Sequence, residues 1–106
     1  MTEPMSELSA EDVKLVTLAR ATRARTGAAE GAAVRDLDGR TYAAATISLP
    51  SLSVSALGVC IAMAVSSGSG GLEAAVVMGV ASLTDDDAAA LHEFAGDAIV
   101  VHTIAG

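Results

Sequence analysis

The sequence predicts one α/β domain in which helices cover both faces of a mixed sheet, in the order α-β-β-α-β-α-β. Three observations predict it in a chain of 106 residues, the size of a single domain. Apolar residues recur at helical spacing after Ser9, the Asp38-Gly39 pair marks a tight hairpin turn, and residues 74–81 and 98–104 are apolar runs of strand length. Helical connections between the later strands imply a mixed sheet with three layers.

The first helix is expected to begin after Ser9 and to run to about Arg25. Ser9 is a favourable N-cap, and two acids follow it in the first turn, where they suit the positive end of a helix. Gly27 and the Ala-Gly stretch after it end the helix. Residues 1–8 are expected to form a flexible tail, which leaves residues 9–106 as the single domain.

A hairpin follows the first helix. Residues 32–36 and 40–47 are short strand-like runs on either side of Asp38-Gly39. Pro50 is expected to close the second strand, because proline has no N–H to donate to a sheet.

A second helix is expected from a cap at Ser53 or Ser55 through Val65. This segment is apolar on all sides, which predicts that it is buried. Residues 66–71 consist of Ser and Gly and predict a flexible loop.

The strand at residues 74–81 is apolar throughout, as expected for a strand that is covered on both faces. Thr84 can cap a third helix, whose first turn contains three consecutive aspartates at positions 85–87. The run at residues 98–104 is the last predicted strand.

Charge is distributed unevenly along the chain. The formal net charge is −7, and all six basic residues lie within the first 40 positions. Binding of a phosphate backbone needs a basic face. The cluster of Arg20, Arg23 and Arg25 is the one basic group that the sequence offers, so nucleic-acid binding is disfavoured.

The composition also argues against a membrane or a secreted protein. The uncharged run from Thr41 to Leu72 is interrupted by Pro50 and by glycines, and its best helical part is shorter than the ~20 residues of a membrane span. Cys60 is the single cysteine, so it cannot form an internal disulfide, and the acidic N-terminus lacks the pattern of a signal peptide. A cytoplasmic location is therefore expected.

Five short segments resemble, in their order and spacing, the homotetrameric cytidine deaminase family over roughly residues 12–105. The resemblance implies a three-layer α-β-α cytidine-deaminase-like fold. The segments are Gly31-Ala32-Ala33, similar to a Val-Gly-Ala-Ala strand opening; Asp38-Gly39-Arg40-Thr41-Tyr42, similar to an Asp-Gly-Lys/Arg-Val-Tyr hairpin; Ala64-Val65-Ser66-Ser67-Gly68, similar to the end of the zinc-site helix; Leu91-His92-Glu93-Phe94, similar to the Leu-Arg-Glu-Phe after the second metal motif; and Asp97-Ala98-Ile99-Val100-Val101, similar to the last shared strand.

The places of the family's metal motifs hold other residue types. Counting without gaps puts the first motif, Cys-Ala-Glu or His-Ala-Glu, on residues 55–57, and the second, Pro-Cys-x-x-Cys, on residues 83–87. The resemblance then assigns the ligand places to Ser55, Thr84 and Asp87, and the place of the proton-transferring Glu to Leu57. The family's nucleoside-binding Asn-x-Glu-Asn run falls on a shorter stretch here. We therefore expect a vestigial pocket at Thr46, Ser48, Ser55, Leu57, Thr84 and Asp87.

These residue types do not support the family's reaction. The reaction needs zinc on three Cys or His ligands, which lowers the pKa of a bound water, and a non-ligand Glu that moves protons. Hydroxyls are poor, neutral zinc ligands, and leucine cannot transfer a proton. We therefore expect no catalytic residue, no bound metal and no other cofactor.

Other chemistry-bearing residues have simpler structural interpretations. Cys60 is expected to be buried and inert, His92 to face solvent on the third helix, and His102 to be a hydrogen-bonded residue of the last strand. The three aspartates at 85–87 are expected to stabilise the third helix. The alternative is that they offer, with neighbouring hydroxyls, oxygen ligands to a hard cation such as magnesium.

Three functions remain open. The leading hypothesis is a non-catalytic structural or interaction module that acts as a homo-oligomer, a dimer or a tetramer, through its neutral second helix; an unidentified protein partner is a further option. Oligomerisation would add burial to a small-residue core. The alternative is a sensor that binds a nucleoside or another small ligand in the vestigial pocket. The third is an active zinc-dependent cytidine deaminase.

Overall fold

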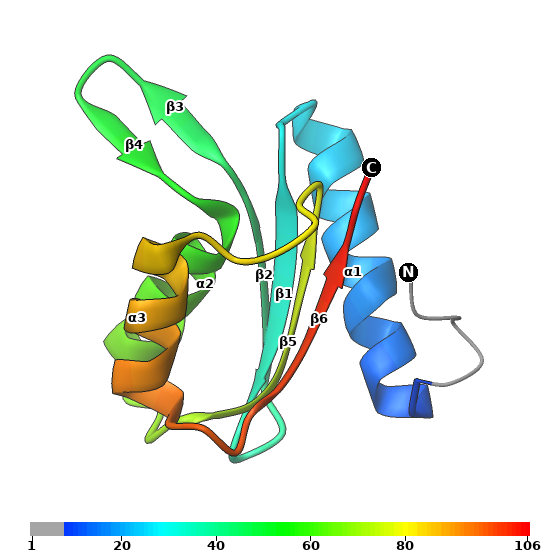
Figure 1. Ribbon diagram of the computed structural model, residues 1–106, viewed down its shortest axis with the longest axis vertical. Coiled ribbons are helices and arrows are strands. Elements are labelled where there is room, and N and C mark those ends of the chain that lie inside the picture. Colours follow the sequence, from blue (N-terminus) through cyan, green and yellow to red (C-terminus); the bar gives the residue numbers. More distant parts are fainter. Residues whose placement is uncertain (1–7) are drawn as a thin grey trace.

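The computed structural model describes residues 8–106, in which three helices and six strands form (Figure 1). Most of the predicted tail lies outside the described residues; its last residue, Leu8, is partly buried against the core. The elements are α1 (Ala10–Thr26), β1 (Gly31–Asp36), β2 (Thr41–Ala45), β3 (Ile47–Leu49), β4 (Leu52–Val54), α2 (Ala56–Ser66), β5 (Leu72–Met78), α3 (Asp85–Ala95) and β6 (Val100–Ile104).

The main sheet has the strand order β2-β1-β5-β6. Strand β1 pairs antiparallel with β2 and with β5, and β5 pairs parallel with β6 across the α3 connection. Helix α1 covers one face of this sheet, and α2 and α3 cover the other (Figure 1). The predicted three-layer α/β fold with a mixed sheet is therefore confirmed.

The side chains of the two central strands alternate between two core clusters, one on each face of the sheet. On β1, Ala32 and Val34 belong to the cluster under α2 and α3, whereas Ala33 belongs to the cluster under α1. Helix α1 lies close to the start of β1, because a Cβ atom at Gly31 would lie 2.3 Å from the carbonyl oxygen of Ala19. Small residues at this contact therefore set the distance between helix and sheet.

Three hydroxyl side chains cap the three helices, as the sequence predicts. Ser9 caps α1, Ser55 caps α2 and Thr84 caps α3, each by accepting a hydrogen bond from a backbone N–H three residues further on. The alternative cap for α2, Ser53, lies instead on β4.

The second strand ends earlier than the sequence predicts, and a hairpin follows that the sequence did not indicate. Strand β2 ends at Ala45, and the backbone N–H and the hydroxyl of Thr46 bond to Glu30, the residue before β1. Pro50 therefore does not close β2; it forms, with Ser51, the two-residue turn between the paired strands β3 and β4. This hairpin stands away from the main sheet (Figure 1).

Helix α2 is buried on one side only, so the prediction of complete burial is wrong for its outer side. Leu57, Cys60 and Ala64 are fully buried against the sheet, whereas Ala62 is exposed and Val65 is 53% exposed. None of the helices within residues 8–106 has the length and apolar character needed to cross a membrane.

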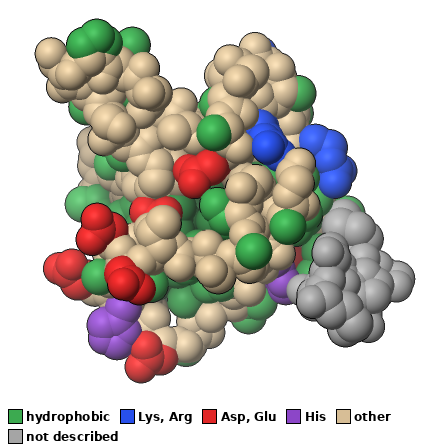
Figure 2. Space-filling model, turned by 45° about the horizontal axis from the view of Figure 1, so that its top comes forward, with side chains coloured by type: hydrophobic (Ala, Val, Ile, Leu, Met, Phe, Trp, Pro, Cys, Tyr) green, Lys and Arg blue, Asp and Glu red, His purple; other side chains and the backbone are tan. Residues whose placement is uncertain are grey.

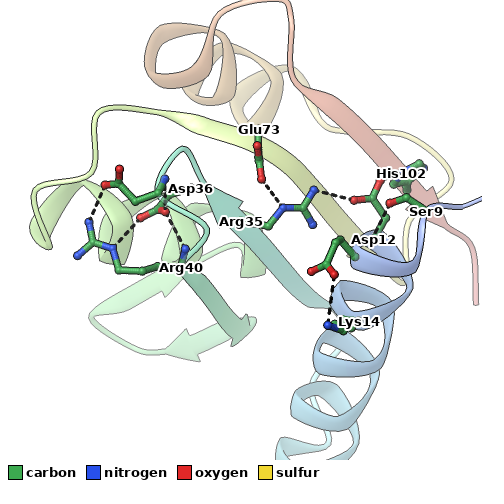
Figure 3. Close-up of polar contacts among 10 residues, drawn as sticks. Ser9, Asp12, Lys14, Arg35, Asp36, Arg40, Glu73 and His102 are labelled. Atoms are coloured by element: carbon green, nitrogen blue, oxygen red, sulfur yellow. Dashed lines mark hydrogen bonds and ion pairs between the residues drawn. The ribbon is translucent and has the colours of Figure 1, made fainter.

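An ionic cluster ties α1 to the sheet (Figure 3). Arg35 of β1 binds Asp12 of α1 at 2.9 Å and also Glu73 of β5, and His102 of β6 lies 2.9 Å from the other carboxylate oxygen of Asp12. Burial opposes the charge of Asp12, but the hydrogen bonds with His102 and Arg35 outweigh it and hold the pKa of this carboxyl below its ordinary value. His102 is thus hydrogen-bonded, as expected.

A second cluster surrounds Asp36 at the end of β1. Its fully buried carboxylate accepts hydrogen bonds from the hydroxyls of Ser69 and Tyr42, from two backbone N–H groups of the β1–β2 turn, and from the guanidinium of Arg40. Figure 3 shows the contacts between Arg40 and Asp36. The loop before β5 is thereby fastened to the β1–β2 turn.

Candidate functional site

The N-terminal ends of α2 and α3 meet on one side of the sheet, and three of the predicted site residues lie there. The hydroxyl of Ser55 donates to Oδ1 of Asp87 at 2.6 Å and accepts from the backbone N–H of Gly58 at 3.0 Å. The hydroxyl oxygen of Thr84 accepts from the backbone N–H of Asp87 at 3.2 Å. Two helix caps and one carboxylate therefore form a single hydrogen-bonded unit between helices.

Asp87 differs from the two aspartates that precede it. Asp85 and Asp86 are exposed at the positive end of α3, as expected of charges that stabilise a helix start. Asp87 is only 9% exposed and bonds to Ser55 instead of to solvent. A magnesium ion bound through Oδ1 of Asp87 would compete with that bond.

A second carboxylate reaches the start of α2, and the sequence analysis missed it. Oε1 of Glu30 accepts from the backbone N–H of Ala56 at 3.3 Å and from the hydroxyl of Thr46 at 3.3 Å. Ala56 is the first residue of α2. The N–H groups of Ala56 and Gly58, both in the first helical turn, are therefore hydrogen-bonded to side chains of this chain. The sequence feature that could have indicated a role for Glu30 is that it is the one charged residue between Gly27 and Val34.

The remaining two predicted residues take no part in this hydrogen-bonded group. Leu57 is fully buried in the core cluster between α2 and the sheet. Ser48 is exposed on β3, opposite Ser53 of β4, in the hairpin that stands away from the main sheet. The predicted pocket residues thus divide into a bonded group at the helix ends, a core residue and a hairpin residue.

The reactive side chains elsewhere match their structural interpretations. Cys60 is fully buried, its thiol lies 3.6 Å from the carbonyl oxygen of Tyr42, and burial raises the pKa of that thiol to about 12. A thiol with so high a pKa is a poor nucleophile at neutral pH. His92 is exposed on α3, and its Nδ1 lies 2.7 Å from Asp97.

The residues present at the helix ends do not fit a zinc ion. Zinc in proteins is held by thiolates, imidazoles and carboxylates, whereas positions 55 and 84 present neutral hydroxyls. The hydroxyl of Ser55 already uses its proton on Asp87 and a lone pair on the N–H of Gly58. Within residues 8–106, no three His, Cys, Asp or Glu side chains are grouped as a metal ion would need.

A shallow apolar groove lies on the outer side of α2, away from the bonded group. It has a volume of about 440 Å³. Its lining residues come from β2 and from α2 and the turn after it, and they are Tyr42, Val59, Ala62, Met63, Ser66 and Ser67.

The sheet order and the helices on both faces of the sheet define a three-layer α/β domain. The family described as cytidine deaminase-like matches residues 8–106. The chain therefore belongs to the cytidine deaminase-like family.

Solved structures of cytidine deaminases share this fold. The chain is similar to the cytidine deaminase of Mycobacterium leprae, with a TM-score of 0.77 and 21% identity over 90% of this chain and 89% of that one. It is similar to the cytidine deaminase of Mycobacterium tuberculosis, with a TM-score of 0.76 and 23% identity over 88% and 85% of the two chains. Comparison with curated proteins gives no match.

Proposed function

We propose that this chain is a non-catalytic member of its family, a structural or interaction module of the cytoplasm that acts as a homo-oligomer. The 2.6 Å hydrogen bond between Ser55 and Asp87 carries the proposal. Two residues that the resemblance assigns to zinc ligands bond to each other. The residue assigned to proton transfer, Leu57, fills the core. Such a site has neither the set of metal ligands nor the acid–base group that deamination requires.

The same bonds give little support to a nucleoside sensor at this site. Ligand recognition needs polar groups that are free to bond to the ligand. Here Ser55 bonds to Asp87, and Thr46 bonds to Glu30. A nucleoside that bonded to Ser55 or Thr46 would have to compete with these internal bonds.

The outer side of α2 supports the oligomer. The sequence from Thr41 to Leu72, which includes α2 and the β3–β4 hairpin, has no charged residue in a chain of net charge −7. Figure 2 shows acidic side chains gathered over the α3 side of the molecule. Like charges on two copies repel, so copies of this chain meet at lowest cost through their uncharged surface. The exposed Ala62 and Val65 and the apolar groove lie on that surface.

An Ala62→Glu variant tests the oligomer. A glutamate on the outer side of α2 places a charge in the proposed interface and should raise the dissociation constant at least about tenfold. We expect light scattering and sedimentation at micromolar concentration to show a dimer or tetramer for the wild type and a smaller species for the variant. Circular dichroism should show that the helix content is unchanged.

Ala89→Glu is the matched control. Ala89 is also an exposed alanine within a helix, on α3, so the same substitution there should leave the molecular mass unchanged. A wild-type monomer at these concentrations, or an equal loss of assembly in both variants, would count against oligomerisation through α2.

A further inference from the structure

The side chains of Ser55, Thr84 and Asp87 belong to one connected hydrogen-bonded group at the starts of α2 and α3. Ser55 gives its proton to Asp87 and accepts from the N–H of Gly58, while the N–H of Asp87 is bonded to Thr84. A substitution at any of these positions would therefore affect the start of a helix, and a substitution of Ser55 or Asp87 would also affect the link between the two helices.

The hydrogen bond between Ser55 and Asp87 lies in surroundings that favour a strong bond. Asp87 is only 9% exposed, so water competes weakly for its carboxylate. The acceptor is a carboxylate oxygen and the bond is 2.6 Å long, within the range of charge-assisted O–H···O hydrogen bonds. The positive end of α2 also favours a carboxylate beside Ser55.

We infer that the Ser55–Asp87 bond, positioned by Thr84, is a metal-free clasp that fastens α2 to α3. The inference rests on the proposed function, since the clasp occupies the place that the resemblance assigns to zinc. A structural metal stabilises a fold by tying together the elements that supply its ligands. Here a hydrogen bond between the same elements has that structural role.

A double-mutant cycle tests the clasp. The variants are Ser55→Ala, Asp87→Ala and the two together, with the unfolding equilibrium measured in urea at one protein concentration. Each single substitution should raise the unfolding equilibrium constant about 10- to 100-fold, because it leaves a buried polar group without its partner. Asp87→Asn should have a smaller effect than Asp87→Ala, since its amide oxygen can still accept from Ser55.

The clasp predicts that the two single effects are coupled by about tenfold or more, so that the double variant is little worse than the more damaged single one. Asp86→Ala is the control, because Asp86 lies in the same helical turn but is exposed; it should change the equilibrium constant by less than about threefold. Single effects that multiply independently in the double variant would overturn the clasp.

Repeating the cycle with EDTA separates this inference from the proposed function. A hydrogen-bonded clasp gives the same coupling with and without the chelator. A wild-type protein that loses stability in EDTA would show that a metal holds the helices, which would overturn both the clasp and the proposed absence of zinc. If the two substitutions change the unfolding equilibrium constant independently and the wild type is insensitive to EDTA, the clasp alone is overturned.

Discussion

Replacing Leu57 with alanine is expected to lower the free energy of unfolding by about 2–5 kcal/mol, as for other large-to-small changes in protein cores. Leu57 is fully buried in the core cluster between α2 and the sheet, so the lost atoms leave a cavity inside the core. The effect can be measured by urea unfolding at constant protein concentration, since assembly would otherwise contribute to the stability.

Leu52→Ala is the control for this prediction. Leu52 lies on β4 and is 50% exposed, so the same truncation there should cost no more than about 0.5 kcal/mol.

Leu57→Glu, which restores the residue type that the resemblance assigns to proton transfer, should destabilise the protein more than Leu57→Ala, because it puts a carboxylate into an apolar core. A tolerated glutamate at this position would show that Leu57 lines an accessible pocket.

Replacing Asp36 with asparagine is expected to lower the melting temperature by roughly 10 °C. The carboxylate of Asp36 accepts hydrogen bonds from hydroxyl, guanidinium and backbone groups, and an amide would present its own N–H groups to some of these donors. The exposed Asp38 in the same turn provides the control: Asp38→Asn should lower the melting temperature by no more than about 2 °C.

The pH dependence of stability gives a second measure of Asp36. The hydrogen bond from Ser69, with those from the backbone of the turn, lowers the pKa of Asp36 from 3.8 to about 2 despite its burial. Because the folded-state pKa is lower than the unfolded one, this carboxylate stabilises the fold above about pH 4, and the contribution is lost as the pH falls towards 2. Melting curves between pH 5 and 2 should therefore decline more steeply for the wild type than for Asp36→Asn. Parallel declines would contradict this assignment.

The fold could be predicted where its signals are local. The three caps, Ser9, Ser55 and Thr84, and the Asp38-Gly39 turn each act over three or four residues, and all lie where the sequence predicts. The end of β2 and the β3–β4 hairpin could not be predicted in this way. Thr46 lies between these two elements and bonds to Glu30, which is 16 positions away and meets it only in the folded chain.

In the candidate site, too, the features set by local sequence could be predicted, whereas those set by contacts between distant residues could not. Counting along the resemblance placed Ser55, Thr84 and Asp87 together, because helix starts keep their register with the segments that follow them. The role of Glu30 could not be predicted, since its partner Ala56 follows 26 positions later in a different layer. Ser48 was assigned to the pocket from a stretch of altered length, and it lies instead on the hairpin.

We propose that the hydroxyls of positions 55 and 84, one carboxylate and a buried leucine do not form a zinc-dependent deaminase site. The direct measurement is the metal content of the protein after incubation with zinc and removal of the excess, followed by a cytidine deamination assay with an active cytidine deaminase as positive control. We predict far less than one zinc per chain and no uridine above the blank. About one tightly bound zinc per chain, or uridine formed in proportion to the amount of protein, would contradict the claim.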